Sequence, residues 1–154
     1  MLKKLLLVVL TLFILSACLR DSNNEPCAEF DTIAQRDFLE ENKLNDDIIV
    51  TDSGLQYRII EEGDGSRPRP NSDVIVRYVG TLTDGTTFDS SSSARFPLNN
   101  VIFGFREAIQ LMNVGSIHEV FIPPSLGYGD RPPANSEICP GQVLIFEIEL
   151  LDIR

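Results

Sequence analysis

Residues 73–88 read DVIVRYVGTLTDGTTF, and this stretch decides the fold class. Residues 73–82 alternate, which predicts a β-strand with Val74, Val76 and Tyr78 on one face and Ile75, Arg77 and Val79 on the other. Asp84 and Gly85 form a dipeptide that is typical of a tight turn between two strands. Residues 86–88 are therefore expected to begin a second strand, antiparallel to the first.

The chain around this hairpin adds further strands and one short helix. Residues 55–60, 116–122 and 143–153 are rich in β-branched and other apolar residues, and each is a predicted strand. The spacing of apolar residues over 105–112 predicts a helix of about two turns. Together these elements predict an α+β domain over residues 51–154, with one short helix on an antiparallel sheet.

The first residues have the pattern of an export signal. Lys3 and Lys4 precede an apolar run over residues 5–15, which is shorter than the roughly 20 residues of a membrane-spanning helix. The run ends in LSAC, which resembles the lipobox of bacterial lipoproteins, in which the cysteine, here Cys18, carries the lipid. We expect a signal peptide over 1–17 and a tether over 18–25; the alternative is an ordinary secretory signal that is cleaved nearby.

Anchoring through Cys18 would attach the protein to a bacterial membrane. Leu19 follows the cysteine at a position where an Asp would resemble an inner-membrane retention signal. This favours the outer membrane, with the protein facing the periplasm. The 23 acidic against 13 basic side chains give a formal net charge of −10, which argues against nucleic acid as a partner.

Residues 26–50 are expected to form an N-terminal helical extension. Phe30, Ile33 and Phe38 recur at helical spacing, and Pro26 suits the first turn of such a helix. The apolar stripe fits packing against the domain, and it equally fits a surface for a partner or a second copy. The sequence leaves these alternatives and the oligomeric state open.

Lipidation of Cys18 would leave two cysteines, Cys27 and Cys139. In an oxidising compartment they either form a disulfide or remain as free thiols. His118 is the one histidine of the chain, and we expect it to face solvent from the strand over 116–122. With one histidine and no closely spaced cysteines, neither a metal site nor a cofactor is predicted.

The usual motifs for nucleophilic catalysis and phosphate binding do not occur in the sequence. Residues 123–142 instead form a long connection that holds five of the nine prolines. Loops of about 20 residues in compact domains are often functional. Any chemistry is therefore expected to rely on aromatic and aliphatic side chains.

Several motifs in one order resemble the FKBP-type peptidyl-prolyl cis-trans isomerases. The resemblance covers about 100 residues and is carried by residues 53–65, 76–91 (VRYVGTLTDGTTFDSS), 96–105 (FPLNNVIFGF), 114–129 (VGSIHEVFIPPSLGYG) and 144–150 (LIFEIEL). It implies a twisted, half-open antiparallel sheet wrapped around one short helix. It also implies an enzyme that interconverts cis and trans X-Pro bonds in proline-containing polypeptides.

The resemblance also implies roles for ten residues. Tyr78, Asp89 and Tyr128 would be catalytic, with the Tyr128 hydroxyl as a hydrogen-bond donor and Asp89 at the pocket edge. Ile102 would present its backbone N–H to a substrate carbonyl. The substrate-binding residues would be Phe88, Phe96, Val101, Ile102, Phe105, Ile138 and Phe146.

The sequence departs from the family pattern in three places. Many members carry Trp where this chain has Phe105, which predicts a deeper pocket and a retained but weaker isomerase activity. Phe103 replaces a small residue or Pro and is expected to be exposed, while residues 90–94 predict a shortened loop before Phe96. The alternative function is a proline-segment binding or chaperone module with negligible turnover.

Overall fold

The computed structural model describes Cys27 and residues 30–154. The predicted signal peptide over 1–17, Cys18, the tether over 18–25 and Pro26 lie outside the described residues. Within the described part, neither α-helix has the length and hydropathy needed to cross a membrane.

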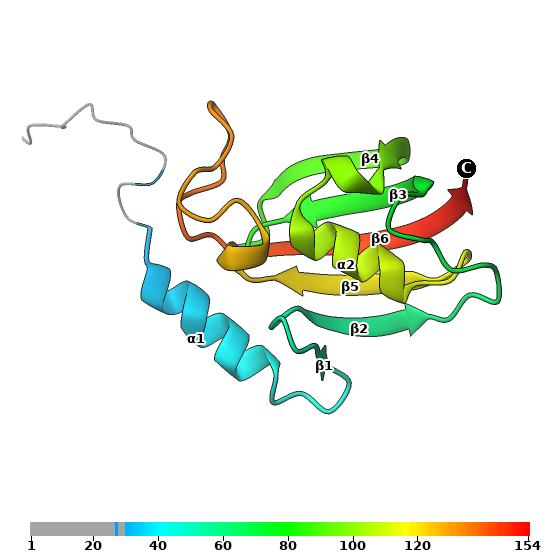
Figure 1. The fold of residues 1–154 in the computed structure, drawn as a ribbon. Helices are drawn as coiled ribbons and strands as arrows, with labels where there is room; N and C mark the ends of the chain where they lie inside the picture. The colour runs from blue at the N-terminus through cyan, green and yellow to red at the C-terminus, as the bar shows by residue number, and fades with distance from the viewer. Residues whose placement is uncertain (1–26, 28–29) are drawn as a thin grey trace, which may run out of the picture.

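One twisted sheet forms the body of the described chain, with a short helix on one of its faces (Figure 1). Its strands are β1 (Ile49–Val50), β2 (Gln56–Glu61), β3 (Asp73–Thr81), β4 (Thr87–Pro97), β5 (Ile117–Ile122) and β6 (Leu144–Ile153). They lie in the order β1-β2-β5-β6-β3-β4, and each neighbouring pair is antiparallel. This confirms the predicted fold class; the two-residue strand β1 is too short to give a pattern in the sequence.

The β3–β4 hairpin follows the alternation that predicted it. Val74, Val76 and Tyr78 are buried on the face that carries the core. The connection closes with a hydrogen bond of 2.8 Å from the Leu82 N–H to the Thr86 carbonyl. Gly85 has a φ of +86°, a backbone conformation that glycine adopts without steric cost.

Helix α2 (Phe103–Leu111) lies across the sheet in front of β5 and β6 (Figure 1). It begins two residues before the predicted start and buries Phe105, Ala108 and Ile109 against the core. Gly104 fixes how closely the helix approaches the sheet, because a Cβ there would meet the Ile122 side chain at 2.5 Å. The first turn of α2 is therefore held tightly against β5.

The shortening expected over residues 90–94 goes further than predicted, because no loop remains there and these residues lie inside β4. Ser91 pairs with Tyr78 of β3 and Ala94 pairs with Val76, with an irregularity in the register between them. A run of serines has weak strand propensity of its own, so the extended backbone here depends on the ladder that β3 supplies.

The expectation for His118 is wrong. Its side chain is 2% exposed and stacks on Tyr57, with ring centroids 5.5 Å apart. On β5 it lies on the same face as Val120 and Ile122, which are fully buried under the helix. The alternation of the strand therefore outweighs the polarity of the imidazole.

Burial of His118 predicts that the fold loses stability in mild acid. Both imidazole nitrogens are buried, and neither has a hydrogen-bond partner among the described residues. Burial lowers the pKa of His118, with the charge of Glu62 opposing and that of Arg67 adding to the shift. Below about pH 6.5 the imidazole of the unfolded chain binds a proton that the folded chain does not bind. The free energy of unfolding therefore decreases as the pH is lowered, by up to about 1.4 kcal/mol per pH unit.

Urea unfolding at pH 7.5, 6.5 and 5.5 measures this loss. His118→Leu removes the titrating group from the same buried position, so the variant is expected to show a smaller loss than the parent chain. Equal losses in the two proteins would contradict the assignment to His118.

Helix α1 (Thr32–Asn42) packs on the domain through a polar seam. Asp31 caps the helix by accepting a hydrogen bond of 2.8 Å from the Ile33 N–H, so the helix begins at Thr32. Ile33 is exposed, and the predicted apolar stripe is wrong at that position. Phe38 contacts Phe121, with ring centroids 6.1 Å apart.

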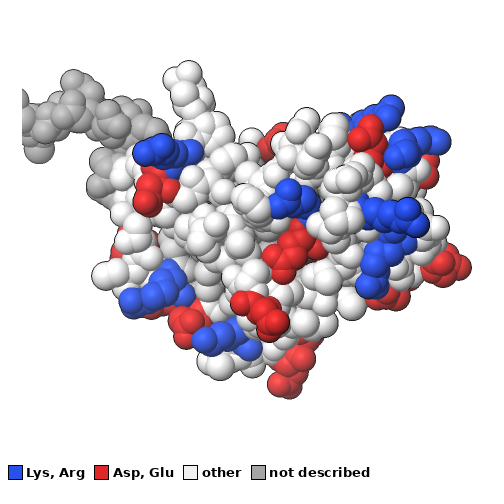
Figure 2. All heavy atoms as spheres, in the orientation of Figure 1, with Lys and Arg blue, Asp and Glu red and all other residues white. Residues whose placement is uncertain are grey.

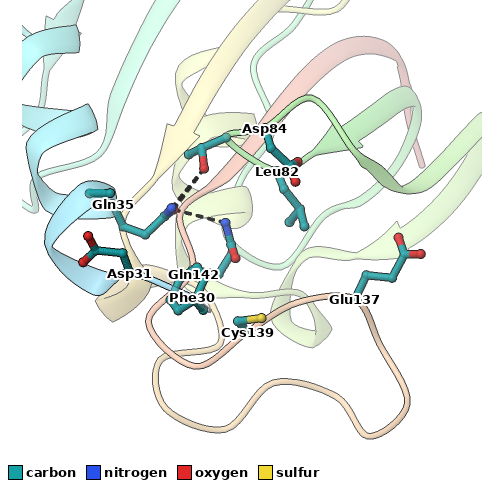
Figure 3. A pocket seen from close by; sticks show the side chains of 10 residues that line it. Phe30, Asp31, Gln35, Leu82, Asp84, Glu137, Cys139 and Gln142 are labelled. Atoms are coloured by element: carbon teal, nitrogen blue, oxygen red, sulfur yellow. Dashed lines mark hydrogen bonds between the residues drawn. The ribbon is translucent and has the colours of Figure 1, made fainter. Parts of the chain in front are cut away.

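Gln35 is the residue of α1 that is buried, at 8% exposure. Its amide nitrogen donates to the Thr83 hydroxyl at 3.0 Å, and its amide oxygen accepts from the Gln142 side chain and the Val143 N–H, both at 3.1 Å. Figure 3 shows this network beside Cys139 and the long loop. One glutamine thus joins α1 to the β3–β4 turn and to the start of β6.

A disulfide joins Cys27 to Cys139, with the Cα atoms 5.6 Å apart. Of the two alternatives left open by the sequence, the structure contains the disulfide. It ties the segment before α1 to the loop over residues 123–142.

Candidate active site

A cavity of about 250 Å³ opens between the start of α2, strands β3, β4 and β6, and the long loop. Its lining is mostly aromatic and aliphatic, and it consists of Tyr78, Asp89, Phe96, Asn100, Val101, Ile102, Phe105, Tyr128 and Phe146. Eight of the ten predicted site residues are thus brought together, although they come from segments far apart in the sequence.

Aromatic rings packed edge to face form the base of the cavity. The Phe105 ring lies 5.2 Å from Phe146, 6.0 Å from Tyr78 and 6.1 Å from Phe96, measured between centroids, with interplanar angles of 76–81°. Such tilted pairs place the positive edge of one ring on the negative face of the next. The arrangement gives the cavity a firm apolar floor with Phe105 at its centre.

Two predicted substrate-binding residues, Phe88 and Ile138, do not line the cavity. Phe88 packs behind the floor on the Phe146 ring, with centroids 5.4 Å apart at 88°. A Cβ at Gly80 would meet Phe88 at 2.7 Å and Phe146 at 2.8 Å, so glycine is needed there for both rings to lie over β3. Ile138 belongs to the long loop, and its side chain is buried in the core.

The polar groups lie at the edge of this apolar floor. The Tyr78 hydroxyl donates a hydrogen bond of 2.7 Å to the Asp89 carboxylate. Burial, this hydrogen bond and the Asp89 charge raise the pKa of Tyr78, and burial with the Asp89 charge raises the pKa of Tyr128. Both phenols therefore keep their protons at neutral pH and act as hydrogen-bond donors.

Two donors at the cavity remain available to a ligand. The Tyr128 hydroxyl and the Ile102 N–H, which immediately precedes α2, make no hydrogen bond with the described residues. A carbonyl group above the aromatic floor would satisfy either donor. The site therefore suits a small apolar ring flanked by peptide carbonyls.

Asn100 lines the cavity and was missed by the sequence analysis. It ends the short 3-10 helix Leu98–Asn100, directly before the lining residues Val101 and Ile102. Its position next to these two residues was the one available signal, because no motif marks a lone asparagine.

The described residues contain no group of three or more His, Cys, Asp or Glu side chains placed to hold a metal ion.

Comparisons with known proteins match both parts of the chain. A profile of FKBP-type peptidyl-prolyl cis-trans isomerases matches residues 65–151. A profile of the domain amino-terminal to such isomerases matches residues 20–59.

Curated relatives and solved structures agree with these profiles. The chain is 41% identical to an outer membrane protein MIP of Legionella longbeachae, over 92% of this chain and 64% of that protein. It is 48% identical to an FKBP-type 22 kDa peptidyl-prolyl cis-trans isomerase of Escherichia coli, over 75% of this chain and 58% of that protein. The chain thus spans less than two thirds of the length of either relative.

Among solved structures, a peptidyl-prolyl cis-trans isomerase of Pseudomonas syringae superposes with a TM-score of 0.76 at 34% identity, covering 79% of this chain and 92% of that one.

Proposed function

Because the chain belongs to the FKBP-type peptidyl-prolyl cis-trans isomerases, we propose that it catalyses rotation of X-Pro bonds in exported polypeptides. The observation that carries the proposal is the cavity itself, in which an aromatic floor, the Tyr78–Asp89 pair and two available donors meet. The proline ring occupies the floor over Phe105, and the peptide runs across the rim.

The proposed mechanism is non-covalent and depends on differential binding. Amide resonance gives the peptide bond a rotational barrier of about 18–20 kcal/mol. The planar amide is more polar than the twisted one, so it loses more hydration in an apolar cavity. The cavity therefore favours the twisted state over the planar state, and this difference lowers the barrier.

The polar residues hold the peptide while the bond rotates. The Ile102 N–H and the Tyr128 hydroxyl donate to substrate carbonyls. Asp89 fixes the Tyr78 ring through its hydrogen bond and places a carboxylate at the edge of the cavity, near the twisting carbonyl. Phe96 and Val101 form walls, while Phe88 and Ile138 support the floor and the loop from behind.

We further propose that the protein is anchored to the outer membrane through a lipid on Cys18 and faces the periplasm. A signal peptide over 1–17 would be removed, and residues 18–25 would tether the helical segment 26–50 and the isomerase domain 51–154. The name of the Legionella relative, an outer membrane protein, supports this location. The Cys27–Cys139 disulfide supports an oxidising compartment.

The second candidate function is a binding or chaperone module with negligible turnover. Phe105 favours it, because the chain places Phe at the cavity floor and contains no Trp. A proline segment would then be held in the same cavity without efficient rotation of its imide bond.

Isomerisation of an X-Pro tetrapeptide by a chain that begins at Leu19 tests the proposal. We expect acceleration over the spontaneous rate, a kcat/KM that falls at least about tenfold in Asp89→Ala, and a smaller loss in Tyr128→Phe, since each loses a polar contact. Val79→Ala, on the other face of β3, is the matched surface control. A folded chain without acceleration would favour the binding module.

Phe105→Trp separates the two candidates further. The larger ring restores contact with the proline, so its kcat/KM is expected to exceed that of the parent by a few fold. A wholly inert parent beside an active Phe105→Trp variant would contradict the proposal that the native chain is an isomerase.

A further inference from the structure

A second cavity, of about 370 Å³, lies on the outer side of α2 and is not used by the mechanism above. We call it the Phe103 groove; its lining residues are Ser53, Phe103, Arg106, Glu107, Gln110, Leu111 and Leu126.

The Phe103 groove and the aromatic cavity share two walls. Ile102 lines the aromatic cavity and the next residue, Phe103, lines the groove. On the long loop, Tyr128 lines the cavity and Leu126, two residues earlier, lines the groove. Because consecutive Cα atoms are about 3.8 Å apart, the two sites are separated by only one or two residues along each of these walls.

Phe103 forms an exposed apolar platform in the groove. Its side chain is 65% exposed, in the first turn of α2. The Arg106 guanidinium lies 4.5 Å from the ring centroid, a cation–π contact that favours this orientation of the ring. The helix beneath lies close to the sheet, because a Cβ at Gly104 would meet the Ile122 side chain at 2.5 Å.

The charged groups of the groove are engaged with neighbours. The Glu107 carboxylate accepts from the Ser53 hydroxyl at 2.7 and 2.9 Å, and Arg106 lies over the Phe103 ring. Acidic and basic side chains are interspersed over the face that carries α2 (Figure 2). An apolar ligand group therefore suits the platform of Phe103, Leu111 and Leu126 better than a charged one does.

We propose that the Phe103 groove is an extended subsite of the isomerase, which takes an aromatic or long aliphatic side chain of the substrate near its proline. This rests on the proposed function of the aromatic cavity. Because the two sites share walls, the side chain lies within a few residues of the proline along the substrate. Phe103 thereby selects substrates that carry apolar residues beside their prolines, a feature of unfolded segments.

A peptide series tests this subsite. Each peptide has one X-Pro bond in a serine-rich background and one Phe, placed two, three or four residues before or after the proline. At one position we expect Phe to raise kcat/KM about tenfold over Ser and to lower Kd by a similar factor. In Phe103→Ala the ratio of kcat/KM between the Phe and Ser peptides is expected to fall to about one to two. Phe103→Leu is expected to keep most of this preference, and the control Val79→Ala all of it.

Two outcomes would overturn the proposal. In the first, Phe has no effect on kcat/KM or Kd at any position of the peptide. In the second, Phe103→Ala retains the full preference for the Phe peptide over the Ser peptide. The Kd values keep this test separate from that of the isomerase activity. A chain that accelerates no peptide but binds the Phe peptides through Phe103 would refute the isomerase and retain the subsite.

Discussion

Phe146→Ala is expected to lower the free energy of unfolding by about 3–5 kcal/mol, the usual cost of truncating a buried Phe. The Phe146 side chain is 5% exposed, and its ring packs edge to face on Phe88 and Phe105 and at a tilt on Tyr78. Removing it leaves a gap in the floor of the cavity, which Phe146 lines. We therefore expect kcat/KM for an X-Pro peptide to fall by more than about tenfold in the protein that remains folded.

Phe103→Ala is the matched control for stability, because it removes the same side chain from an exposed position. Its unfolding free energy is expected to change by less than about 1 kcal/mol, which covers the cation–π contact with Arg106. Urea unfolding of the two variants and the parent measures the difference. Similar losses in both variants would contradict the central place of Phe146 in the core.

The parts of the fold that the sequence predicted are those with a local pattern. The alternation of Val74, Val76 and Tyr78, the Asp84–Gly85 turn and the one-sided helix each follow from the spacing of neighbouring residues. The cavity is different, since its residues come from distant segments. Their meeting was expected from the resemblance to a family, which supplied the long-range information that spacing lacks.

The features that were missed depend on long-range contacts. Gln35 is polar and gives no sign in the sequence that it will be buried, because its partners, Thr83 and Gln142, lie far along the chain. Residues 90–94 become a strand only beside β3. His118 is the exception, because its alternation with Val120 and Ile122 is a local pattern that favours burial although the imidazole is polar.

The link between α1 and the long loop predicts a second large effect on stability. The Cys27–Cys139 disulfide joins residues 112 apart in the sequence. In the chain-entropy account, closing a loop of about 100 residues restricts the unfolded chain by about 4.7 kcal/mol, and measured effects range up to about 5 kcal/mol. We expect Cys27→Ala/Cys139→Ala to lower the free energy of unfolding by about 3–5 kcal/mol.

Reduction of the parent chain provides an independent measurement of the same quantity. A chain that begins at Leu19 contains no other cysteine, so dithiothreitol acts on this bond alone. The reduced parent and the double variant are expected to unfold at the same urea concentration, well below that of the oxidised parent. Dithiothreitol should not change the unfolding of the variant, which has no cysteine. Because the Gln35 hydrogen bonds also hold the loop that carries Tyr128, kcat/KM is expected to fall only a few fold. If the parent unfolds at the same urea concentration with and without dithiothreitol, the disulfide does not stabilise the fold.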